Sequence, residues 1–471
     1  MREKIYIRAD GSLIIGLGHL TRCIALAQML TPEFEPIFVC REIPESILRD
    51  LKRTGFEVNL VITEDDFLSL ITNKDMVVLD DYSFDSAYQT KVKSLCRKLI
   101  CIDDLHEMEF VADLIINHAP GVSHQDYRAT GSTEYALGLD YVLLRPSFLE
   151  QACKKREISI IQSVIICFGG ADYKNLTYST TRSIIQFKEF RKVVIVTGTA
   201  YDQLDSLNEL LNKDNRITHL HSVNEDEMLS LMLQSELAIV PSSGILLEAL
   251  AAGCVVISGT YAENQRIIFE RFLKFGAIES AENFSTEEIV FAIKAVLNKP
   301  GYNKRLIDGL SSKRIFKKIV GLTISLREVE ADDCRLLFLW ANEAGVRTNA
   351  INTDPIEWND HVNWFSKILS GAKSRIFILE RSGNPAGQAR FDLKEDHYII
   401  DYSIDKNFRG QGFSKIMLEK SMNLIGKAKF KAIVKTENLT SVAVFNSLNF
   451  EERETYMDKG TDYRIFQLNH N

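Results

Sequence analysis

A histidine stands at the end of a glycine-rich turn near the start of the chain. The stretch reads YIRADGSLIIGLGHLTR, from Tyr6 to Arg22, and its histidine is His19. Apolar residues then recur at helical spacing, which predicts a helix that begins near Gly18 or His19. The positive end of a helix dipole disfavours a charged imidazole, so we expect a neutral ring that can accept a proton. On these residues alone, a histidine that merely packs in the turn is an equal alternative.

Two polar residues flank this histidine. Asp10 follows a strand-like segment, and we expect it to orient the ring of His19 or to hold its proton. Arg22 lies about 60° round the predicted helix from His19, so both side chains can face one ligand. Together these residues predict a general base near the carboxyl end of a strand.

A second candidate stretch is PSSGILLEALAAGCVVI, residues 241–257. Ser243 and Gly244 precede a predicted helix, whose free N–H groups and dipole suit a diphosphate. Glu248 can accept hydrogen bonds from a ribose diol, or it can simply support the first half of the helix. Asn264, in GTYAENQ after the next strand, is a candidate contact for a sugar or a phosphate.

A third candidate stretch, DKNFRGQGFSKIMLEKSMNLI, covers residues 405–425. It combines a tight turn with the start of a helix, so its backbone amides can close on a pyrophosphate. The candidate residues are Arg409, Gly410, Gln411, Gly412, Phe413 and Ser414.

The segment 342–365 contains side chains suited to an acceptor substrate. Arg347, His361 and Trp364 could grip a nucleotide diphosphate and stack on a base or sugar. The alternative is that Trp364 belongs to the core and His361 to a helix surface.

Two groups of residues raise the question of a metal. CIDDLH contains Asp103, Asp104 and His106, and HLH places His219 and His221 on one face of a possible strand. Neither group has the spacing of an established site, so no metal is expected.

The elements that would position these residues fall into three regions. In residues 1–150 and again in 151–321, short β-branched runs alternate with helical stretches, which is typical of parallel βαβ units. We expect two Rossmann-like lobes with a cleft between them; a single doubly wound sheet is the alternative. Residues 150–159 are a candidate polar hinge, and residues 298–321 a basic helix that closes the second lobe. Residues 322–471 are expected to form a separate α+β domain with a period-two strand at HYIIDYSI.

Composition limits the classes of protein. The 471 residues carry 45% hydrophobic and 25% charged residues and a formal net charge of −8, which favours small ligands over nucleic acid. The eight cysteines include no CxxC pair and are interpreted as reduced thiols. Neither a signal peptide nor a membrane span is expected, so the predicted location is cytoplasmic.

The first 300 or so residues resemble the UDP-sugar hydrolases of pseudaminic acid biosynthesis, relatives of GT-B glycosyltransferases. The motifs, in family order, are RADGSxxIGxGHxxR, DDY ending at Tyr82, LLRP containing Arg145, FGGAD and SSGxxxEALAAG. The resemblance implies hydrolysis, with inversion, of the bond from the anomeric carbon to UDP, without a metal. His19 would be the general base, Tyr82 would lie near the sugar, and Arg145 and residues 243–248 would hold UDP. A GT-B glycosyltransferase that transfers to an alcohol is the rival interpretation.

Residues 322–471 resemble the GCN5-related N-acetyltransferases. Their turn motif is matched by Arg409 to Ser414, and the later stretch KAIVKTENLTSVAVFNSLNF by Asn438 and a closing Asn449-Phe450. The resemblance implies acetyl-CoA as co-substrate, with Ile404 and Asn438 among its contacts. Phe445 occupies the position where many members carry a tyrosine that protonates the leaving thiolate. The acid is therefore unassigned among Tyr398, Tyr402 and Tyr456, and a domain that only binds CoA is the alternative.

Both resemblances point to one pathway. They imply acetylation of the 4-amino group of a UDP-linked 4-amino-4,6-dideoxy sugar, followed by removal of UDP from the diacetamido product. The expected protein is a bifunctional enzyme of nonulosonic acid biosynthesis, and an association with other enzymes of that pathway is left open.

Overall fold

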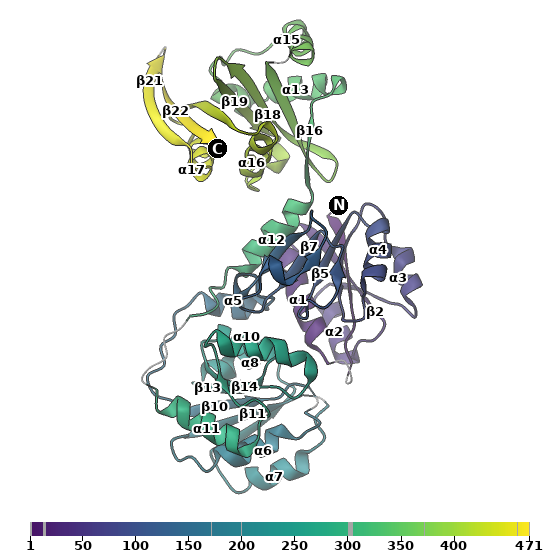
Figure 1. The fold of residues 1–471 in the computed structure, drawn as a ribbon, viewed down its shortest axis with the longest axis vertical. Helices are drawn as coiled ribbons and strands as arrows, with labels where there is room; N and C mark the ends of the chain where they lie inside the picture. Colours follow the sequence, from purple (N-terminus) through teal and green to yellow (C-terminus); the bar gives the residue numbers. More distant parts are fainter. Residues whose placement is uncertain are drawn as a thin grey trace. The chain divides into compact units, whose positions relative to one another are not determined.

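The computed structural model describes residues 2–12, 16–170, 172–198, 200–299, 305–371, 373–458 and 460–470. Residues 13–15 of the glycine-rich turn and Ala171 of FGGAD lie outside these ranges. The chain divides into two compact units, Met1–Ile319 and Val320–Asn471 (Figure 1).

The first lobe of the N-terminal unit is a parallel sheet with helices on both faces (Figure 1). In sheet order, its strands are β3 (Glu57–Leu60), β2 (Phe34–Cys40), β1 (Glu3–Ala9), β4 (Met76–Asp80), β5 (Lys98–Ile102), β7 (Leu114–Asn117) and β9 (Glu134–Leu137). Its helices are α1 (Gly18–Leu30), α2 (Glu45–Arg53), α3 (Glu64–Leu70) and α4 (Ser86–Leu95). A small pair, β6 (Glu109–Phe110) and β8 (Arg128–Ala129), and the 3₁₀ turns η1 (His124–Asp126) and η2 (Leu139–Tyr141) lie outside this sheet.

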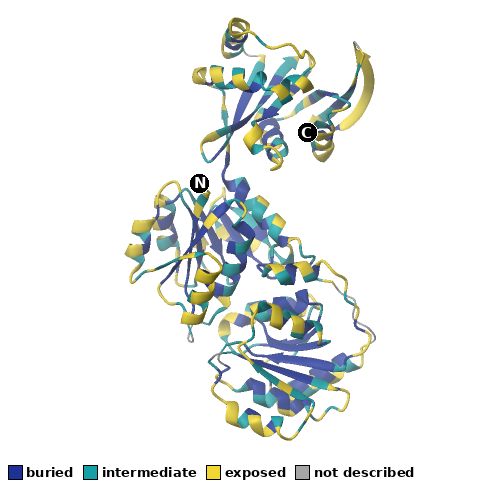
Figure 2. Ribbon diagram, turned by 180° about the vertical axis from the view of Figure 1, so that it is seen from behind, coloured by how far each residue is buried: buried dark blue, intermediate teal, exposed yellow. Residues whose placement is uncertain are grey.

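The central strands of this lobe are apolar because the sheet is covered on both faces. Every residue of β4 is buried, as are all four residues of β7. Continuous burial of this kind is typical of parallel sheets between two helical layers. Figure 2 shows the buried strands at the centre of the lobe, with exposed residues on the outer faces of the helices.

The second lobe is built in the same way. Its parallel strands, in sheet order, are β12 (Ile217–His221), β11 (Lys192–Thr197), β10 (Ser163–Cys167), β13 (Leu237–Pro241), β14 (Val255–Gly259) and β15 (Glu279–Ser280). Its helices are α6 (Leu176–Ile184), α7 (Leu204–Leu211), α8 (Glu225–Leu233), α9 (Gly244–Ala251), α10 (Arg266–Lys274) and α11 (Thr286–Leu297), with the 3₁₀ turn η3 (Glu263–Gln265) before α10. Two separate parallel sheets confirm the expected pair of lobes against the single doubly wound sheet.

Two helices at the lobe junction correct the sequence-based boundaries. Helix α5 (Pro146–Ala152) packs on α8 and α9, so the first part of the expected polar hinge, residues 150–159, is helical. The basic helix expected over residues 298–321 is α12 (Ser311–Leu322) alone; residues 300–304 lie outside the described ranges. Nζ of Lys318 in α12 lies 3.0 Å from a carboxylate oxygen of Glu134 in β9, so α12 contacts the first lobe.

The C-terminal unit is an α+β domain, as expected. Its seven-stranded sheet has the order β16 (Ile324–Glu328), β17 (Ser374–Arg381), β18 (Asn384–Lys394), β19 (His397–Ile404), β20 (Ala428–Lys435), β22 (Thr461–His470) and β21 (Glu451–Asp458). Neighbours are antiparallel except β19 and β20, which run parallel. Its helices are α13 (Cys334–Ala341), α14 (Ala344–Asn349), α15 (Trp358–Ser370), α16 (Phe413–Ile425) and α17 (Leu439–Ser447), with the 3₁₀ turns η4 (Ala331–Asp333) and η5 (Lys406–Phe408).

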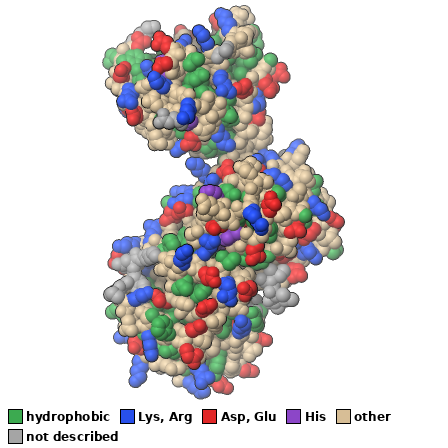
Figure 3. Space-filling view, in the orientation of Figure 1, with side chains coloured by type: hydrophobic (Ala, Val, Ile, Leu, Met, Phe, Trp, Pro, Cys, Tyr) green, Lys and Arg blue, Asp and Glu red, His purple; other side chains and the backbone are tan. Residues whose placement is uncertain are grey.

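Figure 3 shows how charged side chains are distributed on one face of the protein. On the face drawn in Figure 3, basic and acidic side chains are interspersed and do not gather into a basic stripe. No helix among the described residues is long and apolar enough to cross a membrane.

Candidate functional site

The carboxyl ends of neighbouring strands in the first lobe carry a group of polar residues. Asp10 follows β1, Asp80 ends β4, Asp104 follows β5 and His118 follows β7. Since β1, β4, β5 and β7 are consecutive neighbours in a parallel sheet, these ends meet at one edge. All four side chains are nevertheless buried.

His19 lies in the first turn of α1 and faces this edge. The helix begins at Gly18, as the apolar pattern predicts, and Gly16 adopts φ +87°, a left-handed conformation that favours glycine. The ring Nδ1 of His19 lies 2.7 Å from Oδ1 of Asp80. A carboxylate at Nδ1 holds the proton on that nitrogen, which makes Nε2 the proton acceptor of the neutral ring.

The partner of His19 is therefore Asp80, and the prediction that Asp10 orients the ring is wrong. The Asp10 carboxylate instead accepts hydrogen bonds from Arg8 at 2.8 Å and from the backbone N–H groups of Arg41 and Glu42. It ties the end of β1 to the loop after β2. Asp80 could have been found in the sequence as the last residue of a buried strand, the position where such sheets carry ligand-binding groups.

Arg22 holds two carboxylates in place beneath the ring. Its Nε and Nη2 donate to Asp80 at 2.7 and 2.5 Å, and its Nη1 donates to Asp104. Burial alone would raise the pKa of Asp80, but Arg22 and His19 outweigh it and hold that pKa well below its usual range. Arg22 is itself buried, and its Nη2 also lies 3.2 Å from Nδ1 of His19, so it contacts both the histidine and its carboxylate partner. Its expected contact with a ligand stays a prediction.

Tyr82 packs against His19 and joins the same network. Its ring meets the imidazole edge-on, with centroids 4.8 Å apart, and its hydroxyl donates to Asp104 at 3.2 Å. Burial raises the pKa of Tyr82, and the nearby Asp104 carboxylate raises it further. Burial also lowers the pKa of His118 to about 4, so this second histidine is neutral near pH 7.

A cavity of ≈ 580 Å³ opens beside these residues. It is lined by Asp10, His19, Arg41, Glu42, Asp81, Tyr82, Ser83 and Asn264. Asn264 lies in η3 of the second lobe, so both lobes contribute to this cavity. The volume is in the range of small-ligand sites. A side chain added at Gly18 would meet open space, so packing does not require a glycine there.

The second lobe places the predicted diphosphate residues at the start of α9. Ser243 precedes the helix and is half-buried, while Gly244, its first residue, is exposed. Glu248 is buried and accepts hydrogen bonds from Nε and Nη2 of Arg145 at 3.2 and 2.6 Å. Burial raises the pKa of Glu248, and Arg145 opposes this effect. These two side chains, expected to contact a nucleotide separately, are bonded to each other beside the first turns of α9.

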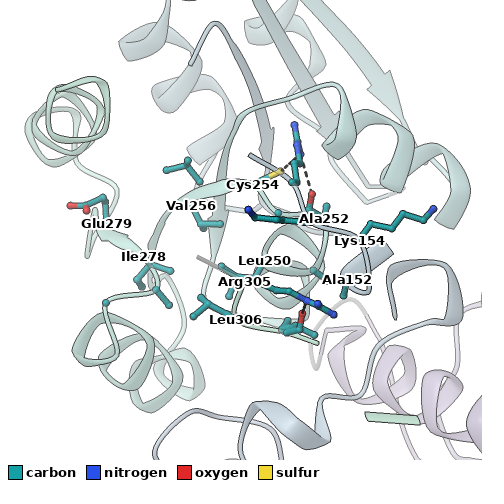
Figure 4. A pocket seen from close by; sticks show the side chains of 18 of the residues that line it. Ala152, Lys154, Leu250, Ala252, Cys254, Val256, Ile278, Glu279, Arg305 and Leu306 are labelled. Carbon is teal, nitrogen blue, oxygen red and sulfur yellow. Dashed lines mark hydrogen bonds between the residues drawn. The ribbon is translucent and has the colours of Figure 1, made fainter. Parts of the chain in front are cut away.

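A second cavity, of ≈ 390 Å³, shares no lining residue with the cavity beside His19. Figure 4 shows the side chains that line it. Its most connected cation is Arg156, which donates to four backbone carbonyls at the ends of α8 and α9. The acceptors are Met232, Leu233, Ser235 and Ala252, at 2.8 to 3.1 Å. Arg305, labelled in the same view, donates to the carbonyls of Ile307 and Asp308. These two arginines of the cavity therefore hold backbone carbonyls of the protein in place.

The candidate metal residues have other partners. Asp103 accepts from the backbone N–H of His106 at 2.9 Å and from the hydroxyl of Tyr127 at 3.0 Å. His219 and His221 both hydrogen-bond to Thr197, at 2.8 and 3.1 Å. Within the described ranges, no three His, Cys, Asp or Glu side chains are grouped to hold a metal ion.

In the C-terminal unit, the predicted glycine turn leads into α16. Gly410 and Gly412 adopt φ +80° and +78°, left-handed conformations that favour glycine at both positions. The side chains around this turn form hydrogen bonds or ion pairs with other residues of the protein. Arg409 bonds to Glu343 and to the carbonyl of Ile404, and Gln411 accepts from Arg381. Phe413, the first residue of α16, has a buried side chain, so only its backbone is available at the turn. Ser414 follows it in the first turn of the helix.

Asn438 caps α17: its side-chain oxygen accepts from the N–H of Ser441 at 3.1 Å. Ile404 is the last residue of β19 and is buried.

The expected acceptor residues lie in structural positions. His361 is 2% exposed and hydrogen-bonds to the carbonyl of Cys334, so neither the predicted ligand contact nor the alternative surface position holds. Arg347 donates to the carbonyls of Asn352 and Asp354 and thereby shapes its own loop. Trp364 is half-buried, and the guanidinium carbon of Arg390 lies 5.4 Å from the centroid of its ring.

Comparisons with known proteins separate the same two regions. Residues 338–450 match the acetyltransferase (GNAT) family. An uncharacterized protein of Methanocaldococcus jannaschii is 24% identical over 98% of this chain and 99% of its own. The UDP-2,4-diacetamido-2,4,6-trideoxy-β-L-altropyranose hydrolase of Campylobacter jejuni is 24% identical over 56% of this chain and 93% of its own.

The spore coat polysaccharide biosynthesis protein SpsG of Bacillus subtilis is 24% identical over 58% of this chain and 81% of its own. Among solved structures, spermidine N-acetyltransferase from Vibrio cholerae, in complex with CoA and spermine, is 16% identical. It covers 31% of this chain and 96% of its own, with a TM-score of 0.29.

Fold and sites together define a two-part protein of the α/β and α+β classes, with two GT-B-like lobes followed by an acetyltransferase fold. The chain is a fusion of a region homologous to the altropyranose hydrolase and SpsG with a C-terminal GNAT domain.

Proposed function

We propose that the N-terminal unit hydrolyses the bond between UDP and a diacetamido-trideoxy sugar. The observation that carries this proposal is the pair of His19 and Asp80, joined at 2.7 Å beside a cavity that both lobes line. Homology to a hydrolase of that specificity and to a spore coat polysaccharide protein supports the class of substrate.

In the proposed reaction, Nε2 of His19 takes a proton from a water molecule. The water oxygen forms a bond to the anomeric carbon on the face opposite UDP, and the bond from that carbon to the UDP oxygen breaks. Configuration inverts, UDP leaves as an anion, and His19 later returns its proton to solvent. One positioned base suffices because a nucleoside diphosphate is already a good leaving group.

The start of α9 is the proposed place for the diphosphate. Ser243 and Gly244 stand where a helix leaves its first N–H groups without partners inside the helix. Arg145 adds positive charge close by, held in position by Glu248. Tyr82 and Asn264 line the cavity from opposite lobes and are the proposed sugar contacts.

For the C-terminal unit, we propose acetyl transfer from acetyl-CoA to the amino group of a UDP-linked 4-amino-4,6-dideoxy sugar. The GNAT match and the glycine turn before α16 support this step. The turn from Arg409 to Ser414 would hold the pyrophosphate through backbone amides. The acetylated product is then the substrate of the N-terminal unit, so consecutive steps of nonulosonic acid biosynthesis lie on one chain.

The test of the hydrolase is release of UDP from the diacetamido UDP-sugar in water alone. We expect His19→Ala to lower turnover by about 10² to 10⁴-fold and to leave UDP affinity nearly unchanged. The matched control is His124→Ala, which removes an exposed histidine of the same lobe. Near-normal turnover of His19→Ala would contradict the base assignment. Transfer to an added glycan, without release in water, would show a glycosyltransferase instead.

A further inference from the structure

Strands β19 and β20 separate part-way along the C-terminal sheet. Their parallel pairing ends at Ile400 and Ala432, although β19 continues to Ile404 and β20 to Lys435. Tyr402 lies two residues beyond the last pair and shares a face of β19 with Ile400, because side chains alternate along a strand. Its ring therefore stands where the two strands have begun to part.

The hydroxyl of Tyr402 lies between the starts of two helices. It is 2.9 Å from Oγ of Ser441, in the first turn of α17. The side chain of Ser414, at the start of α16, lies near enough to lower the pKa of Tyr402, against the larger effect of burial, which raises it. Both partners are uncharged, and the neighbouring carboxylate, Asp401, is exposed on the opposite face of the strand.

Phe445 of α17 lies beside Tyr402 and carries no hydroxyl of its own. Its ring is buried in a cluster with Phe450 and Phe466, and Tyr402 meets it edge-on at 5.9 Å. Helix α17 thus presents a hydrocarbon ring at this point. The phenol of the adjacent strand occupies the same neighbourhood.

We propose that Tyr402 is the general acid of the acetyl transfer, an inference that rests on the acetyltransferase function proposed above. The amine nitrogen forms a bond to the thioester carbonyl carbon, and the carbon–sulfur bond breaks. The departing sulfur takes the proton of the Tyr402 hydroxyl, and the amine loses its extra proton to solvent. Ser441 and solvent return a proton to Tyr402. A thiolate with an ordinary pKa of about 8.5 leaves more readily when it is protonated in place.

The other two candidate tyrosines lie elsewhere. Tyr398 is on the same face of β19, but it stacks on Phe430 within the paired part of the two strands. Tyr456 lies on β21, where every residue is exposed, and stacks on Tyr463. Among the described residues, no hydrogen bond joins the hydroxyl of Tyr398 or Tyr456 to the first turn of α16 or α17.

The experiment compares Tyr402→Phe with Tyr398→Phe in the full-length protein. Three quantities are measured: acetyl-CoA affinity by calorimetry, turnover with the UDP-4-amino sugar, and the thiol pKa of bound CoA from thiolate absorbance. We expect Tyr402→Phe to lower turnover by about 10² to 10³-fold with unchanged acetyl-CoA affinity. The pKa of the bound thiol should rise by about 1 to 2 pH units, because a hydrogen bond to the thiolate is lost. Tyr398→Phe should behave as the wild type in all three measurements.

The outcomes separate this inference from the function on which it rests. A wild-type protein that neither binds acetyl-CoA nor acetylates the sugar overturns the acetyltransferase function itself. An active wild type with Tyr402→Phe near full turnover, or with an unchanged bound-thiol pKa, overturns the role of Tyr402 alone. Recovery of turnover in the double variant Tyr402→Phe/Phe445→Tyr would support it further, because the hydroxyl would return from the facing helix.

Discussion

Replacing Asp80 with asparagine is the sharpest perturbation of the N-terminal site. The substitution keeps the size of the side chain but removes the charge that faces His19 and Arg22. An amide can donate to Nδ1 of His19, which favours the tautomer protonated at Nε2, and that tautomer cannot accept the proton of water. We therefore expect turnover to fall by about 10³ to 10⁴-fold, the scale seen when a buried carboxylate behind a catalytic histidine becomes an amide.

The same substitution has a cost in stability. Asp80 is fully buried and pairs with Arg22 at 2.5 Å, and breaking such a pair costs about 3 to 5 kcal/mol. Arg22 keeps its second partner, Asp104, so we expect a loss near the lower end of that range, about 3 kcal/mol. Because the pKa of Asp80 is depressed in the folded state, its stabilisation is complete above about pH 4. That stabilisation is lost as the pH falls toward and through the pKa of Asp80 in the folded protein. The free energy of unfolding of Asp80→Asn should therefore lack this pH dependence.

The assay combines UDP release with thermal unfolding between pH 3 and pH 8. Asp65→Asn, an exposed carboxylate of the same lobe, is the matched control and should change neither quantity. A folded Asp80→Asn protein whose turnover stays within about threefold of the wild type would refute the pairing of His19 with Asp80 as the basis of catalysis.

Two further predictions concern His118 and Arg156. His118→Gln should flatten the stability profile between about pH 4 and 6.5, because the pKa of His118 is lowered on folding and the unfolded chain binds the extra proton. Unfolding followed at several pH values checks this, and an unchanged slope would contradict it. Arg156→Ala should lower the free energy of unfolding by about 2 kcal/mol, since four backbone carbonyls each lose the hydrogen bond that Arg156 donates. Lys154→Ala, which removes an exposed neighbour, serves as the control, and equal melting temperatures for both variants would contradict this role.

Local patterns in the sequence predicted most of the fold. Alternation of β-branched runs with helical stretches predicted two parallel α/β lobes, and apolar spacing after Gly18 predicted the start of α1. These features depend on residues that are close in the sequence, so the spacing of apolar residues predicts them directly. The hinge at residues 150–159 was partly wrong, because polar residues such as Glu150 also suit the exposed face of a short helix.

Local patterns could not predict which side chains contact each other within each site. Asp80 lies 61 residues from His19, and Ser441 lies 39 residues from Tyr402. Which strand ends meet depends on strand order in the sheet, and β4 lies beside β1 although two strands separate them in the chain. His361 is likewise a polar residue that is buried, and its burial depends on tertiary packing.

The sequence by itself thus determined the element types, the glycine turns and the histidine at the start of α1, because backbone conformation and amphipathic spacing are local properties. The tertiary structure alone decided that Asp80, rather than Asp10, holds His19 and that Tyr402 lies between the starts of α16 and α17. Both assignments depend on which helices the sheet order brings beside β4 and β19, a long-range choice driven by burial of apolar faces.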